Sequence, residues 1–88
     1  MVIIVRKPTP EEISATDSWH TWTNEVSTFD WSYDEKETCL ILKGKATVTG
    51  KKGKKISFGS GDFVIFPQGI ECTWQITEPI CKKYTFGE

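Results

Sequence analysis

Glu37, Cys39 and Cys72 are side chains whose types allow chemistry, and each lies in a β-favouring stretch of the sequence. Enclosure by apolar side chains raises the pKa of a carboxyl group, which allows it to act in acid–base catalysis near neutral pH. Glu37 is therefore a candidate general acid or base. Alternation along a strand places Cys39 on the same face as Glu37. Cys72 is a candidate nucleophile, although the single histidine, His20, is distant in sequence. Glu37 and Cys72 are therefore the predicted catalytic residues.

Structural roles are the alternatives for the same residues. Glu37 could lie at the solvent end of a strand, and Cys72 could be a small buried apolar residue. Cys39 is better explained as part of an interior wall than as a catalytic thiol. Cys81 has no motif around it and is assigned to the core or the surface. For His20, an exposed or hydrogen-bonded structural role is the preferred interpretation.

Aromatic side chains make up 12% of the 88 residues and include four tryptophans. Ligand pockets are mostly apolar with a few convergent polar groups, so Trp31, Tyr33 and Trp74 are candidates for a wall around a small molecule. Plain filling of the core is the alternative. The predicted substrate-binding residues are these three together with Asp30 and Cys39.

One short helix and about eight strands are expected to position these side chains. Thr9 can cap a helix, Pro10 suits its first turn, and Glu12 completes a capping box. From Trp19 onward, short β-favouring runs alternate with turn residues. The predicted strands are Thr21–Val26, Phe29–Tyr33, Glu37–Leu42, Ala46–Thr49, Lys54–Phe58, Phe63–Phe66, Glu71–Thr77 and Cys81–Phe86. Connections this short allow only antiparallel neighbours, and this number of strands is typical of a small barrel or jelly roll.

Two spacings in the middle of the chain match the motifs of a known superfamily. Six residues separate Glu37 from Gly44, as in the first cupin motif. The second motif is matched by the spacing of Gly61, Pro67, Gly69 and Cys72. With Trp31 and Tyr33 upstream, the chain resembles the small single-domain cupins that are related to the cupin domains of ureidoglycine aminohydrolase and of the ethanolamine-utilisation proteins. The resemblance implies one all-β domain over residues 1–88, an antiparallel double-stranded β-helix (the cupin jelly-roll barrel) with a short N-terminal helix. In this fold Gly44 is expected to end a strand.

The resemblance does not extend to the metal ligands of metal-bearing cupins. Those proteins use two histidines before the motif glutamate and a third that lies three residues after the last glycine of the second motif. The equivalent positions here are Asp30 and Ser32, or Trp31 and Tyr33 if the loop is one residue shorter, and then Cys72. We therefore expect no cofactor, and a divalent metal held by Asp30, Glu37 and Cys72 is the alternative.

Composition limits the partners and the location. Eleven basic residues against twelve acidic ones give a net charge of −1, so nucleic acid is not an expected partner. The longest apolar run, Val2 to Val5, is too short to span a membrane, and we expect a cytoplasmic protein. Three cysteines without a C-x-x-C pair indicate neither a disulfide framework nor a zinc module. The lysines around Gly50–Gly53 are expected to form a solvated hairpin tip.

Two functions of different classes follow from these observations. The first is a lumen pocket for a small polar metabolite, with metal-independent acid–base chemistry at Glu37. The second is a non-catalytic cupin that has lost its metal site and binds a ligand or a partner protein. A homodimer is expected in either case, because a small barrel gains buried surface by pairing.

Overall fold

The N-terminal elements form as their local sequence signals predict. In the computed structural model, which describes residues 2–87, β1 (Ile4–Arg6) precedes α1 (Pro10–Ala15) and the 3-10 turn η1 (Thr16–Ser18). The capping box is confirmed: the Thr9 hydroxyl accepts from the Glu12 backbone N–H at 3.2 Å, and the Glu12 carboxylate accepts from the Thr9 backbone N–H at 2.9 Å.

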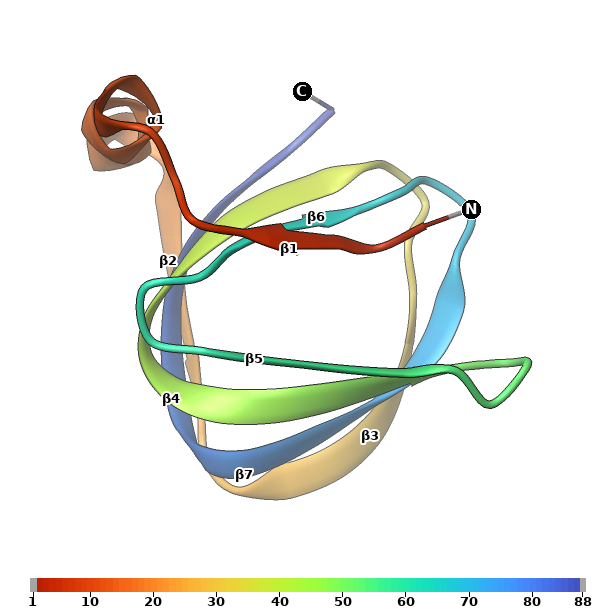
Figure 1. Cartoon of the computed structure of the whole chain (residues 1–88). Coiled ribbons are helices and arrows are strands. Elements are labelled where there is room, and N and C mark those ends of the chain that lie inside the picture. Colours follow the sequence, from red (N-terminus) through yellow and green to blue (C-terminus); the bar gives the residue numbers. More distant parts are fainter. Residues whose placement is uncertain (1, 88) are drawn as a thin grey trace.

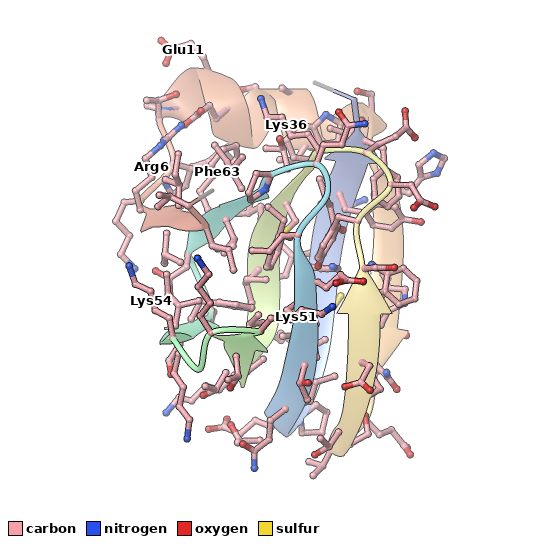
Figure 2. The ribbon with its side chains drawn as sticks, turned by 90° about the vertical axis from the view of Figure 1, so that its right-hand side faces the viewer. Arg6, Glu11, Lys36, Lys51, Lys54 and Phe63 are labelled. Atoms are coloured by element: carbon pink, nitrogen blue, oxygen red, sulfur yellow. The ribbon has the colours of Figure 1, made fainter. Side chains whose placement is uncertain are left out.

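Arg6, the last residue of β1, contacts both α1 and the sheet. Its guanidinium donates to both carboxylate oxygens of Glu12, at 2.8 and 2.6 Å, and lies 4.8 Å from the ring centre of Phe63 (Figure 2). The hydrogen bond from Arg6, followed by the one from the Thr9 backbone, lowers the pKa of Glu12 to about 2.

Every other element is a strand, and all pairings are antiparallel, as expected. These strands are β2 (His20–Asn24), β3 (Ser27–Ser32), β4 (Glu37–Gly50), β5 (Lys55–Gly59), β6 (Phe63–Phe66) and β7 (Glu71–Phe86). The sheet has the order β1-β6-β4-β7-β2, with β3 paired to β7 and β5 paired to β4. Figure 1 shows the two long strands, β4 and β7, curving so that β3 and β5 lie on one side of the enclosed space and β1 and β6 on the other.

Residues 2–87 contain seven strands where about eight were predicted, because two pairs of predicted strands are continuous and β1 is not among the predicted strands. Glu37–Leu42 and Ala46–Thr49 are both parts of β4, and Glu71–Thr77 and Cys81–Phe86 are both parts of β7. Register shifts between Ile41 and Ala46 bend β4 against β7 without breaking it.

Gly44 lies at this bend instead of ending a strand. Its φ is +93°, and the backbone carbonyl of Pro79 occupies the space that a Cβ atom would need. Only glycine allows both the conformation and the close approach of β7.

The core fills the space that β4 and β7 enclose. Its buried members are Tyr33, Cys39, Ile41, Ala46, Val48, Phe58, Val64, Phe66, Cys72, Trp74, Ile76 and Ile80. Each long strand contributes alternate residues to this cluster, which is why one face of each is apolar. Among residues 2–87, no helix is long and apolar enough to cross a membrane.

Candidate functional site

Glu37 and Lys82 form an ion pair inside the barrel. The Lys82 Nζ donates to Glu37 Oε2 at 2.9 Å, and the side chains of Glu37 and Lys82 are 4% and 6% exposed. In the antiparallel ladder between β4 and β7, Glu37 lies opposite Phe86 and Ile41 lies opposite Lys82. Glu37 and Lys82 therefore share one face of the sheet, and the lysine side chain extends along the strand to reach the carboxylate.

Aromatic rings surround the ammonium group of Lys82. Its Nζ lies 4.8 Å from the ring centres of Trp22 and Trp74 and 5.8 Å from that of Tyr84. A desolvated cation–π contact stabilises by about 2 kcal/mol or more at best and by less at exposed sites. The lysine is therefore held by one opposite charge and by the faces of several rings.

A cavity of about 180 Å³ adjoins this ion pair, and we call it the lumen cavity. It is lined by Trp22, Phe29, Trp31, Tyr33, Glu37, Trp74, Lys82, Tyr84 and Phe86. Seven of these nine residues are aromatic, and the only two charged ones are the ion-paired residues. This combination of an apolar wall with a small polar end is typical of small-molecule sites.

Tyr33 contributes a buried hydroxyl to the same cavity. The hydroxyl accepts a hydrogen bond from Trp74 Nε1 at 3.1 Å, and the ring stacks on Phe66 with centroids 4.8 Å apart. Burial, reinforced by the charge of Glu37, raises the pKa of Tyr33 well above its usual range. The hydroxyl therefore stays protonated and remains a hydrogen-bond donor at neutral pH.

The buried thiols lie beside this site but are not set up as nucleophiles. Cys39 is fully buried in the core, where burial raises its pKa to about 12, and it does not line the lumen cavity. Burial and then the charge of Asp30 raise the pKa of Cys72 to about 11, and its Sγ donates to the Trp31 carbonyl at 3.6 Å. Both thiols are protonated at neutral pH, and a thiol attacks as the thiolate.

Asp30, one of the predicted substrate-binding residues, does not line the lumen cavity. Alternation along β3 turns Phe29, Trp31 and Tyr33 toward the lumen cavity and leaves Asp30 and Ser32 on the other face. Asp30 there accepts a hydrogen bond from Thr73 Oγ1 at 2.8 Å.

A larger outer groove of about 520 Å³ lies where the ends of β3 and β4 meet the start of β7. It is lined by Asp30, Trp31, Ser32, Thr49, Gly50, Lys51, Glu71, Cys72 and Thr73. Its charged groups already have partners, since Lys51 pairs with Glu71 and both side chains are mostly exposed. Lys51 lies near the start of β7, in the part of the molecule that faces the viewer in Figure 2. Solvated, paired charges give this groove less capacity for specific recognition than the enclosed ion pair, so the smaller lumen cavity is the better candidate.

The residues of the alternative metal site do not converge. Within residues 2–87, no group of three or more His, Cys, Asp and Glu side chains is placed to hold a metal ion. Asp30 faces away from the lumen, and Glu37 already has an ammonium partner. The donor set therefore does not fit the metal that cupins commonly hold.

Lys82 is the residue of the candidate site that sequence reasoning missed. The signal was present in the alternation of Ile80, Lys82, Tyr84 and Phe86, in which one lysine stands on an otherwise apolar face of a predicted strand. Its ion pair with Glu37 could not be predicted from the sequence, because it depends on the register of β4 against β7.

The curled antiparallel sheet, with its apolar lumen and its order of strands along the chain, defines a jelly-roll barrel of the cupin class. Residues 11–84 match the model of the EutQ-like cupin domain, and the chain belongs to this family.

Solved structures of similar chains agree with this assignment. A DUF861 family protein from Thermotoga maritima is 45% identical, with a TM-score of 0.93, and the match covers 97% of this chain and 99% of that one. The EutQ protein of Clostridium difficile is 21% identical, with a TM-score of 0.70, over 76% of this chain and 52% of that one. A cupin superfamily protein from Desulfitobacterium hafniense is 14% identical, with a TM-score of 0.59, over 99% and 79%. The last two likenesses concern the fold. No functionally curated protein matches the chain.

Proposed function

We propose that the chain binds a small polar metabolite in the lumen cavity, and that Glu37 and Lys82 make the polar contacts without a metal ion. One observation carries the proposal: a nearly fully buried ion pair adjoins a cavity of about 180 Å³. A buried ion pair is often no more stabilising than apolar side chains of the same volume. Its place beside a cavity is therefore better explained by recognition than by stability.

The cavity sets the size of the ligand. A cavity of about 150 Å³ is known to hold benzene, so the lumen accepts a molecule of that size or slightly larger. Within this proposal Glu37 is also the group that accepts a proton from a bound molecule, whereas Cys72 contributes packing.

The tryptophan side chains provide the test. Trp22, Trp31 and Trp74 line the lumen cavity and Trp19 does not, so the four indole N–H signals in a ¹H–¹⁵N spectrum give three reporters and one internal control. We would titrate the protein with a panel of amino acids, amides and hydroxy acids. We expect a ligand to shift the three reporters and to leave the Trp19 signal in place.

Two matched double variants complete the test. E37L/K82M removes the buried pair, and K51M/E71L removes an exposed pair of the same charges. We expect the first variant to lose binding and the second to keep it. The proposal fails if no compound shifts the three reporters, or if E37L/K82M binds as tightly as the unaltered protein. Assaying the bound compound for conversion then separates an enzyme from a binding protein.

A further inference from the structure

At the polar end of the lumen cavity, one carboxylate oxygen has no donor among residues 2–87. Glu37 uses Oε2 to accept from Lys82, and no residue within 2–87 donates to Oε1. Every fully enclosed side-chain nitrogen or oxygen in the described chain has a partner, so Oε1 borders accessible space. A carboxylate can accept about four hydrogen bonds, and this one therefore has capacity for a ligand donor.

The same end of the cavity also offers a donor. The Tyr33 hydroxyl accepts from Trp74 and donates to no residue within the described range, while its proton is retained because burial raises the pKa of Tyr33. Lys82 adds a second donor, since an ammonium group has three N–H bonds and only one of them is directed to Glu37. A ligand meets an acceptor and a donor close together.

The net charge at this end is zero. Glu37 and Lys82 neutralise each other at 2.9 Å, and the other seven residues that line the cavity are uncharged aromatics. An added ion would lose its hydration without finding an unpaired opposite charge, which costs several kcal/mol in a real protein interior. A neutral ligand has no such cost.

The walls favour a flat molecule. Phe29 and Trp74 stack with an interplanar angle of 9°, and Trp22 meets both rings edge-on at 62° and 65°. A further aromatic ring can make offset-stacked or edge-to-face contacts with such walls, which stabilise binding beyond the effect of the buried area.

We propose that the lumen cavity selects neutral, planar cyclic amides, which carry an N–H and a C=O on neighbouring atoms of one ring. The ligand N–H donates to Glu37 Oε1, and its C=O accepts from the Tyr33 hydroxyl or the Lys82 ammonium. This inference rests on the proposed function, because it names the ligand class of the same cavity.

Three related probes test the inference on the unaltered protein. 2-Pyridone has seven non-hydrogen atoms and presents the required N–H and C=O. 6-Methyl-2-pyridone adds a methyl group beside the nitrogen and keeps the N–H, and N-methyl-2-pyridone has the same size but lacks it. Dissociation constants would be measured from the indole signals of Trp22, Trp31 and Trp74. We expect 2-pyridone and the 6-methyl compound to bind alike and the N-methyl compound to bind about tenfold or more weakly, because it leaves the carboxylate oxygen unpaired.

Benzoate and β-alanine, an anion and a zwitterion, complete the set of probes. We expect both to bind more weakly than 2-pyridone. The inference is overturned if either of them shifts the three reporters at lower concentration than 2-pyridone does, and the proposed function then stands with another ligand class. It is also overturned if the two methylated pyridones bind equally, or if no pyridone shifts the reporters. The proposed function itself falls if the wider metabolite panel also leaves the reporters unchanged, or if E37L/K82M binds the panel as tightly as the unaltered protein does.

Discussion

Removing one charge of the buried ion pair should destabilise the protein far more than removing the pair. In K82M the side chain keeps its length and its apolar stem but leaves the Glu37 carboxylate enclosed without a counter-ion. Breaking a buried pair in this way costs about 3–5 kcal/mol. A chain of 88 residues has a free energy of unfolding of about 4–13 kcal/mol, so this change removes about a quarter of it or more. The corresponding fall in Tm is at least about 12 °C.

The double variant E37L/K82M supplies the comparison. Replacing a buried pair by apolar side chains of similar volume is often neutral or stabilising, so we expect the double variant to recover to within about 1 kcal/mol of the unaltered protein. The exposed pair gives the control, because K51M should cost about 1 kcal/mol or less.

Urea unfolding followed by tryptophan fluorescence measures all three variants. The reasoning is refuted if K82M unfolds at the same urea concentration as K51M, or if E37L/K82M is no more stable than K82M alone. Either result would mean that the carboxylate is solvated in the folded state.

Three further predictions concern the scaffold. G44A should destabilise by about 2 kcal/mol more than G53A, because both positions have positive φ but only Gly44 faces a backbone carbonyl where the Cβ would lie; equal urea midpoints would contradict this. In the native protein at pH 7.5, iodoacetamide should modify the partly exposed Cys81 before the buried Cys72, whose pKa burial raises to about 11, and peptide mass spectrometry that found the reverse order would refute the account. The guanidinium partner of Glu12 lowers the pKa of its carboxyl from 4.5 to about 2, so the stabilisation is complete above pH 4.5 and is lost as the pH falls toward 2. The urea midpoint of E12Q should therefore lie below that of the unaltered protein at pH 7 and approach it as the pH falls, and a constant difference would contradict the prediction.

Local sequence signals predicted most of the fold. The capping box of Thr9 and Glu12 depends on residues three apart, and the antiparallel arrangement follows from the short connections, so both could be predicted from sequence. The strand count could not, because the bulges in β4 depend on how β7 crosses it at Gly44. Bends of this kind are set by tertiary contact and not by local propensity.

The candidate site was only partly predictable for the same reason. Strand alternation placed Cys39 and Glu37 on one face, and that placement agrees with the structure. The face of β3 that meets the lumen was ambiguous by one residue, and a shift of one residue exchanges Asp30 for Trp31. Lys82 became part of the site only when the register between β4 and β7 joined residues 45 positions apart.

A crystal structure of the unaltered protein grown with 2-pyridone, or with the tightest compound of the metabolite panel, tests the central claim most directly. We predict density for the compound in the lumen cavity, between the tryptophan rings and within hydrogen-bond distance of the Glu37 carboxylate, with Lys82 still paired to Glu37. Density for the compound in the outer groove beside Asp30, or a Lys82 side chain directed to solvent, would contradict the account.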